Sequence, residues 1–219
     1  ELSKNSDKVY DMSKDKICLI INQENFYTEL NEEYKDLLPE NVWEKGKLNT
    51  RVGTSFDCDR LKNTFESRHF KVIVKKNKTH LEVISILEET VKSINEQNCS
   101  CFYVCVLSHG DEGVVYACNS CYVEVSAIID IMCEDKLESI PKVLIVQSCQ
   151  GPSLQIAIKS KDFLIFWSTV PGFSSIRNRQ TGSWFIQSLC DQMDEAGQHE
   201  HFEEICTNII RDVTNKKWQ

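Results

Sequence analysis

Continuous apolar runs are the most regular feature of the chain, and they predict buried strands. Runs rich in β-branched and aromatic residues are typical of strands covered on both faces. We expect such strands at residues 17–22, 70–74, 101–107, 143–146 and 163–168. Shorter runs at 114–117 and 122–125 predict a β-hairpin with Asn119-Ser120 at its turn.

Apolar residues at three- and four-residue spacing predict amphipathic helices between these strands. The clearest run has Leu81, Ile84, Leu87, Val91 and Ile94 on one face. Further helices are expected at 57–68, with Asp57 as N-cap, at 126–133, at 184–193, capped by Ser183, and at 202–213. The pattern contains no internal repeat and no low-complexity linker, so we expect one α/β domain. The polar stretch 23–56 is long for a connection, and long loops are often functional or disordered.

Composition narrows the class of protein. The chain has 219 residues, of which 41% are apolar and 26% charged, as in an ordinary globular domain. A net charge of -8 argues against a nucleic-acid partner. The absence of a membrane-length apolar run and of a signal-peptide pattern argues against a membrane partner. We therefore expect a cytoplasmic protein.

Cysteine usage supports the same expectation. Eleven cysteines is an odd number, and most lie within apolar strand or helix patterns, which suggests reduced thiols instead of a disulfide framework. Cys118-Asn-Ser-Cys121 has two interpretations, a hairpin turn or half of a zinc site. The turn is favoured because the sequence offers no second pair of ligands. No metal and no organic cofactor are implied.

Two of the predicted strands deliver reactive side chains to their carboxyl ends. The strand at 143–146 leads to Cys149 and Gly151, and the strand at 101–107 leads to His109 and Gly110. In open α/β sheets, ligands bind at the carboxyl ends of the strands. A nearby imidazole favours the thiolate, the nucleophilic form of a cysteine.

This pairing predicts chemistry at an amide carbonyl. Attack by Cys149 would create an oxyanion, for which the backbone N–H groups of Gly110 and Cys149 are natural donors. His109 would then protonate the departing amine. Taken alone, an arbitrary cysteine and histidine are more often a buried thiol and a structural imidazole. The flanking residues decide between the two interpretations.

Several blocks of sequence resemble the caspase family. Gln147-Ser-Cys-Gln-Gly151 is similar to the family's cysteine signature, which has a histidine about 50 residues upstream; here His109 precedes Cys149 by 40 residues. Further blocks similar to the family occur at 49–57, 107–113, 168–172, 177–178 and 182–190, in the same order along the chain as in the family. The resemblance runs from about Lys8 to about Val213. It is strongest to initiator caspases of the death-receptor branch and their insect immune-signalling relatives.

The resemblance implies a fold and a division of the chain. The fold would be a mostly parallel central sheet with helices on both faces. Residues 1–151 would correspond to the large subunit and 162–219 to a small subunit that is truncated before its last strand. Residues 152–161 would be a shortened intersubunit linker without an aspartate.

The resemblance also assigns roles to particular residues. Arg51, Gln147 and Arg177 would hold the carboxylate of a substrate aspartate, which suits planar guanidinium groups. The backbone carbonyl of Asn49 would orient His109. Further substrate contacts would come from Ser175, Ile176 and Trp184. Ser148 departs from the family's usual alanine, and Ser174 and Ile176 stand where aromatic residues commonly build a subsite.

The function implied is that of a cysteine endopeptidase, made as a zymogen, that cleaves after aspartate in apoptosis or innate immunity. Its partners would be protein substrates, a second caspase in a homodimer or heterodimer, and adaptors that bind an absent prodomain. The alternative is a catalytically impaired caspase-like regulator. A small nucleotide-binding module is disfavoured because no strand end carries a glycine-rich phosphate loop.

Overall fold

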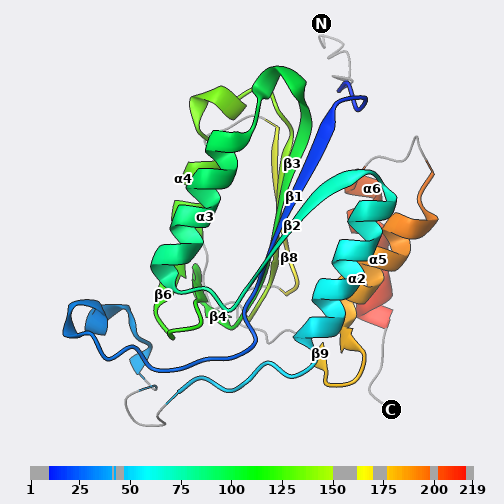
Figure 1. Ribbon diagram of the computed structural model, residues 1–219. Coiled ribbons are helices and arrows are strands. Elements are labelled where there is room, and N and C mark those ends of the chain that lie inside the picture. The colour runs from blue at the N-terminus through cyan, green and yellow to red at the C-terminus, as the bar shows by residue number, and fades with distance from the viewer. Residues whose placement is uncertain are drawn as a thin grey trace, which may run out of the picture.

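A five-stranded parallel sheet forms the centre of the molecule. The computed structural model describes residues 10–40, 42, 47–149, 162–169, 177–197 and 202–215. The strands of the sheet are β1 (Asp15–Asn22), β2 (Phe70–Lys76), β3 (Cys99–Leu107), β7 (Lys142–Gln147) and β8 (Phe163–Trp167). Their order is β2-β1-β3-β7-β8, and every pair is parallel (Figure 1). All five strands predicted for the sheet are therefore confirmed.

Helices cover both faces of this sheet, as predicted. α3 (His80–Ser93) and α4 (Val125–Met132) lie on one face; α2 (Thr54–Ser67), α5 (Trp184–Glu195) and α6 (Phe202–Asn215) lie on the other (Figure 1). The alternation of side chains along each strand supplies both cores. Leu19 and Ile21 of β1 pack under α3, whereas Cys18 and Ile20 pack toward α2 and α5.

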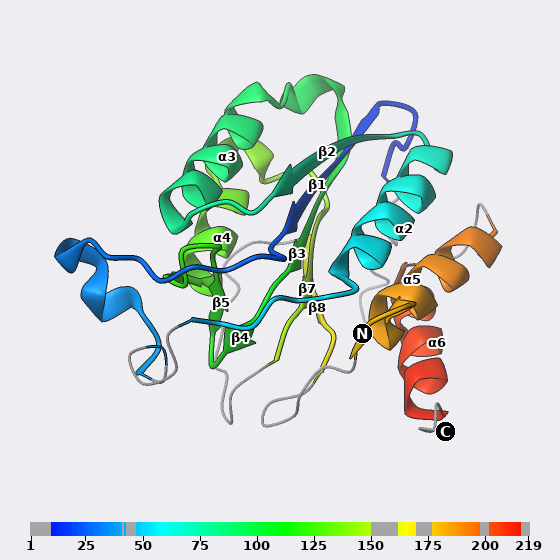
Figure 2. The same ribbon diagram turned by 60° about the horizontal axis from the view of Figure 1, so that its bottom comes forward.

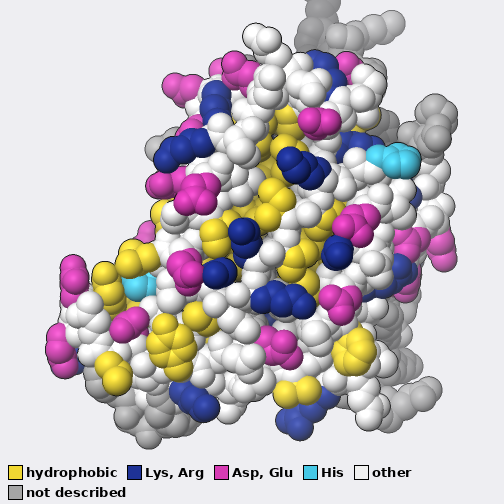
Figure 3. All heavy atoms as spheres, in the orientation of Figure 1, with side chains coloured by type: hydrophobic (Ala, Val, Ile, Leu, Met, Phe, Trp, Pro, Cys, Tyr) yellow, Lys and Arg dark blue, Asp and Glu magenta, His cyan; other side chains and the backbone are white. Residues whose placement is uncertain are grey.

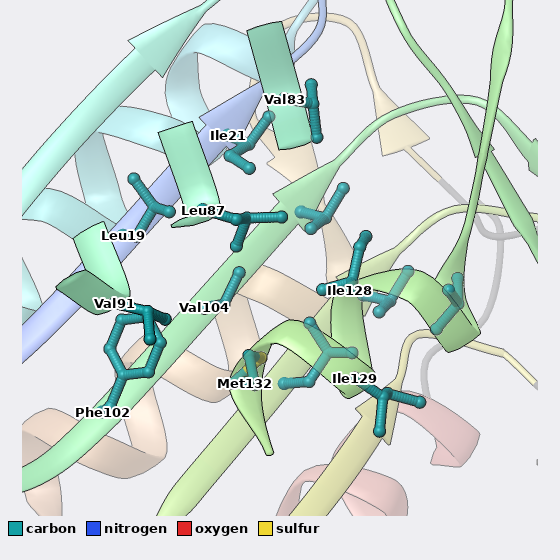
Figure 4. Packing of buried hydrophobic residues seen from close by; sticks show 14 of the residues in the cluster. Leu19, Ile21, Val83, Leu87, Val91, Phe102, Val104, Ile128, Ile129 and Met132 are labelled. Atoms are coloured by element: carbon teal, nitrogen blue, oxygen red, sulfur yellow. The ribbon is translucent and has the colours of Figure 1, made fainter. Parts of the chain in front are cut away.

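The core beneath α3 and α4 is formed by closely packed aliphatic side chains. Figure 4 shows Val83, Leu87 and Val91 of α3 packed together with Leu19 and Val104 of the sheet and with Ile128 and Met132 of α4. Leu87, Val104 and Ile128 are all completely buried. A capping box starts α3: the Thr79 hydroxyl accepts from the Glu82 N–H, and the Glu82 carboxylate accepts from the Thr79 N–H.

Smaller elements complete the described structure. β4 (Gly110–Asp111), β5 (Val114–Tyr116) and β6 (Tyr122–Glu124) form an antiparallel sheet in the order β4-β5-β6, and β9 (Arg177–Asn178) pairs with β10 (Gly182–Ser183). Short 3-10 helices lie at η1 (Glu32–Leu37), η2 (Glu96–Asn98) and η3 (Asp135–Leu137). The hairpin turn predicted at Asn119-Ser120 is confirmed, and Ser120 adopts a φ of 62° there.

One predicted helix boundary was wrong. α2 begins at Thr54 after Gly53, not at residue 57, so Asp57 lies in the first turn and is not the N-cap. Gly53 has a φ of 94°, which an L side chain rarely adopts, and a Cβ there would lie 2.7 Å from the carbonyl oxygen of Asn178. The helix therefore starts where only glycine fits, and the Asp57 carboxylate bonds elsewhere.

The β2 edge of the sheet carries charged side chains. Lys71, Lys75 and Lys76 lie on this strand, which pairs only with β1 among the described strands. Figure 3, in the orientation in which β2 crosses in front of the sheet, shows basic side chains interspersed with apolar ones on this face. Lysines on an edge strand oppose pairing with further chains.

Among the helices that the structure describes, none has the length and apolar character needed to cross a membrane.

The core beneath α3 makes a testable contribution to stability. Leu87→Ala should lower the free energy of unfolding by about 2–5 kcal/mol, because it removes a completely buried side chain and leaves a cavity. Leu81→Ala is the matched control, since Leu81 lies on the same helix and is 55% exposed. Urea denaturation should show a change below about 0.5 kcal/mol for the control. Equal losses in the two variants would contradict this account of the core.

Candidate active site

The thiol and the imidazole singled out in the sequence leave neighbouring strands at the same edge of the sheet. Leu107 at the end of β3 pairs with Gln147 at the end of β7. The pairing continues one residue further, because the Ser108 N–H donates to the Gln147 carbonyl at 3.1 Å. His109 and Cys149 follow directly. Figure 2 turns this edge of the sheet toward the viewer.

The His109 ring is fixed by a backbone carbonyl. Its Nε2 lies 2.7 Å from the carbonyl oxygen of Asn49. A carbonyl oxygen only accepts, so Nε2 carries the proton and Nδ1 keeps a free lone pair in the neutral ring. The ring of Phe26 packs against it, with 5.0 Å between ring centroids. The geometry expected for Asn49 is therefore present.

The electrostatic surroundings keep the imidazole of His109 neutral. Burial lowers the pKa of His109 to about 4, against an ordinary value of 6.5. The Asn49 carbonyl opposes this shift, and the positive charges of Arg51 and Arg177 add to it. At neutral pH the ring is able to accept a proton at Nδ1.

Gly110 is required by the close approach of the two strand ends. A Cβ at this position would lie 2.8 Å from the side chain of Ser148 and 2.8 Å from the carbonyl oxygen of Val114. The Ser148 hydroxyl is buried and has no hydrogen-bond partner among the described residues. Its backbone carbonyl accepts from the Ser168 hydroxyl at 3.1 Å. The backbone of Gly110 is therefore packed against the side chain of Ser148.

Arg51 is a completely buried cation at this edge. One terminal nitrogen donates to the carbonyl oxygen of Gln23 at 3.1 Å and to the Thr54 hydroxyl at 2.7 Å, and the other donates to Oε1 of Gln147. Its Nε is buried and has no partner among the residues that the structure describes. Arg51 and Gln147, predicted to act together, are thus in direct contact.

A second guanidinium lies close to the first. Arg177 of β9 donates from Nε to the carbonyl oxygen of Val52 at 3.2 Å. Burial, together with the positive charge of Arg177, lowers the pKa of Arg51 to about 9, and burial lowers the pKa of Arg177. The negative charges of Asp57 and of a Cys149 thiolate oppose both shifts. Two like charges held together in this way favour the arrival of an anion.

The remaining predicted site residues have mixed outcomes. Ser175 and Ile176 lie outside the described residues, as do Ser174 and the linker 152–161. Trp184 is the first residue of α5 and is partly buried. Cys118 and Cys121 are buried in the hairpin turn, and no group of three metal-ligand side chains occurs in the described ranges.

Three contacts at the site were not anticipated from the sequence. Phe26 packs on the imidazole, Thr54 bonds Arg51, and Asp57 lies near both arginines. For Phe26 and Thr54 the available signal was the polar stretch 23–56, because loops of this length are often functional or disordered. Its length did not say which side chains turn inward.

A thiol and an oriented imidazole at the ends of adjacent strands define a cysteine hydrolase-type site on an α/β sheet. Comparison with known proteins identifies the family, since residues 15–219 match the Caspase domain model. The chain belongs to the caspase family of cysteine-type endopeptidases.

Similarity to individual proteins extends over most of the chain. The chain is 36% identical to Caspase-8 of Drosophila pseudoobscura pseudoobscura over 216 residues, which cover 92% of this chain and 41% of that protein. It is 31% identical to Caspase-3 of Mus musculus, over 91% of this chain and 73% of that protein. The crystal structure of Caspase-1 from Spodoptera frugiperda matches with a TM-score of 0.77 and 28% identity, covering 94% of this chain and 80% of that one. The chain thus spans about two fifths of the length of the Drosophila Caspase-8.

The lowered pKa of His109 predicts a titration that can be measured directly. The NMR signal that disappears in a His109→Gln variant should titrate near pH 4. Between about pH 4 and 6.5 the unfolded chain binds a proton at this position that the folded chain does not bind. The contribution of His109 to stability should therefore rise with pH across this window and fall as the solution is acidified. A midpoint at or above 6.5 would contradict the burial argument.

Proposed function

We propose that this chain is a cysteine endopeptidase that cleaves protein substrates after aspartate, in signalling of the apoptotic or innate-immune kind. One observation carries the proposal. Arg51 is a buried arginine whose Nε has no partner among the described residues, and it lies beside Arg177 at the sheet edge to which His109 and Cys149 also belong. A carboxylate is the ligand that such a pair of guanidinium groups binds best.

Substrate binding would relieve an electrostatic strain. Arg51 is buried and lies near Arg177, and both effects lower the pKa of its guanidinium group to about 9. An aspartate carboxylate would accept from the guanidinium groups, and its negative charge would raise the pKa of Arg51 again. Gln147 accepts from Arg51 through Oε1 and so helps to hold the guanidinium group that would receive the carboxylate.

Acylation would begin at Nδ1 of His109. This nitrogen accepts the proton of the Cys149 thiol, and the sulfur attacks the backbone carbonyl carbon of the aspartate residue. The resulting oxyanion accepts from the backbone N–H groups of Gly110 and Cys149. Collapse of this intermediate breaks the C–N bond, and protonated His109 gives its proton to the departing amine. A thioester on Cys149 remains.

Deacylation would reverse the proton path. His109, neutral again and held through Nε2 by the Asn49 carbonyl, accepts a proton from water at Nδ1 as the water oxygen attacks the thioester. The second tetrahedral intermediate releases the carboxylate product, and the Cys149 sulfur recovers the proton. Each group ends the cycle in its starting state.

Other parts of the proposal extend from the resemblance. Ser175 and Arg177 would pair through their backbone with the extended substrate as a strand. Ile176 would line the second subsite, and Trp184 would line a more distant one. The division into a large-subunit-like part, a short linker and a small-subunit-like part belongs to the same proposal. So do dimerisation with another caspase, adaptor binding by a prodomain and a cytoplasmic location.

A covalent probe tests the nucleophile. Incubation with a peptide ending in an aspartyl aldehyde or ketone should add one probe mass to the intact protein. The adduct should disappear in Cys149→Ala and persist in Cys133→Ala, a matched control at another partly buried thiol. An adduct that survives in Cys149→Ala would sink the assignment of the nucleophile.

The same variants test the alternative function. A regulator that binds and modulates a true caspase without cutting would be indifferent to the loss of Cys149. An effect on partner activation that is equal in the native protein and in Cys149→Ala, combined with no adduct in either, would favour the regulator.

The arginine pair predicts strong selectivity for aspartate. Changing the residue at the cut site from Asp to Asn should lower kcat/KM by about 10⁴-fold, because the buried donors would lose their anionic partner. Substrates with the same Asp-to-Asn change two residues upstream provide the control for overall peptide charge. Similar kcat/KM values for the Asp and Asn substrates at the cut site would contradict the assignment of the pocket.

A further inference from the structure

Asp57 is a completely buried carboxylate that joins α2 to the start of α5. The Ser183 N–H donates to both of its oxygens, at 2.8 Å and 3.0 Å. The side-chain amide of Gln187 donates to Oδ1 at 2.9 Å. Both partners lie more than a hundred residues further along the chain. A single acidic side chain therefore fixes the entry into α5 against the first turn of α2.

The Asp57 tether leads directly to the second arginine of the site. Ser183 is the antiparallel partner of Arg177 in the short β9–β10 ladder. Arg177 then returns to the first segment, because its Nε donates to the carbonyl oxygen of Val52, just before α2. Contacts therefore run from Asp57 to Ser183, from Ser183 to Arg177, and from Arg177 back to Val52, which lies just before the helix that carries Asp57.

Close packing restricts movement of the β9–β10 ladder relative to the start of α2. Gly182 has a φ of 88°, and a Cβ there would collide with Oδ1 of Asp57. On the other side, a Cβ on Gly53 would lie 2.7 Å from the carbonyl oxygen of Asn178. The backbone of the β9–β10 ladder is therefore pressed against the beginning of α2 at two glycines. A shift of Asp57 would move the ladder and the arginine on it.

Charge favours the same arrangement. The negative charge of Asp57 acts on both Arg51 and Arg177, and it opposes the lowering of the Arg51 pKa that the positive charge of Arg177 contributes to. Burial raises the pKa of Asp57, and the hydrogen bonds from Gln187 and Ser183 and the charge of Arg51 oppose this shift. No contact of Asp57 with a substrate is needed for these effects.

We propose that Asp57 is a positioning residue for substrate recognition, which holds the guanidinium of Arg177 beside that of Arg51 by fixing the backbone of Ser183. The kinetic part of this inference rests on the proposed function. The structural part concerns the free protein and is independent of catalysis. Asp57 acts through Arg177, so its loss should weaken binding of an aspartate substrate more than it slows the chemical steps.

The first measurement follows Arg177 without any substrate. In ¹H–¹⁵N spectra, the Nε–H signal of Arg177, assigned by its loss in Arg177→Lys, should shift and exchange faster with solvent in Asp57→Ala. Asp57→Asn keeps one acceptor oxygen for the Ser183 N–H but loses the charge, and it should give a smaller change. Asp59→Ala is the matched control, since Asp59 is an exposed acid on the same helix. Its spectrum should match that of the native protein in this region.

The second measurement separates binding from chemistry. With an aspartate peptide substrate, Asp57→Ala should raise KM by about 10-fold and change kcat by less than about 3-fold, as expected when a supporting residue misplaces a binding group. Asp57→Asn should lie between Asp57→Ala and the native protein. If Asp57→Ala does not fold, Asp57→Asn carries both measurements, with an altered Arg177 signal and a raised KM still expected.

Three results would overturn the inference. They are an unchanged Arg177 signal in Asp57→Ala and Asp57→Asn, a loss of kcat with KM unchanged, and the same changes in Asp59→Ala. A native protein that neither cleaves nor binds aspartate peptides would instead overturn the proposed function, and the Arg177 signal would then decide the role of Asp57 alone.

Discussion

Burial of the Arg51 charge is the constraint on which the carboxyl edge of the sheet depends. An isolated cation in a protein interior costs several kcal/mol unless hydrogen bonds and opposite charge compensate it. The Arg51 guanidinium donates to groups from three separate segments. They are the carbonyl of Gln23 after β1, the hydroxyl of Thr54 at the start of α2, and the side chain of Gln147 at the end of β7. Thr54 in turn donates to Asn22 at 2.7 Å. The first strand, the long polar segment and the cysteine strand are therefore fixed relative to one another by one guanidinium.

The parallel sheet explains why the reactive groups meet at this edge. Parallel strands all end on the same side, and β3 and β7 are neighbours in the sheet although a hairpin and α4 separate them along the chain. Pairing of β3 with β7 brings the residues that follow these strands together. A contact between the Cys149 thiol and the His109 ring is not needed for this. The fold therefore sets the distance between thiol and imidazole through backbone pairing, while side chains such as Phe26 set the orientation of the ring.

The sequence predicted the parts of this structure that local pattern determines. Strands such as 101–107 were recognisable because they are apolar on both faces, and His109 and Cys149 followed from their places at strand ends. The start of α2 was not, because Asp57 looks like an N-cap locally and is instead held by Ser183, 126 residues away. The burial of Arg51 was equally hidden. An arginine in a polar stretch is normally a solvated surface residue, and only the resemblance to caspases indicated an inward role.

The interior placement of the cysteines has a consequence for oxidative stress. Burial raises the pKa of eight of the eleven thiols: Cys18, Cys58, Cys99, Cys101, Cys118, Cys121, Cys190 and Cys206. Peroxide oxidises thiolates that it can reach, so these side chains are protected both by their protonation and by the fold around them. A chain that contains eleven thiols thus offers an oxidant only a few of them while it stays folded. Partial unfolding would expose the rest, so resistance to oxidation should be lost together with the packing of the two cores.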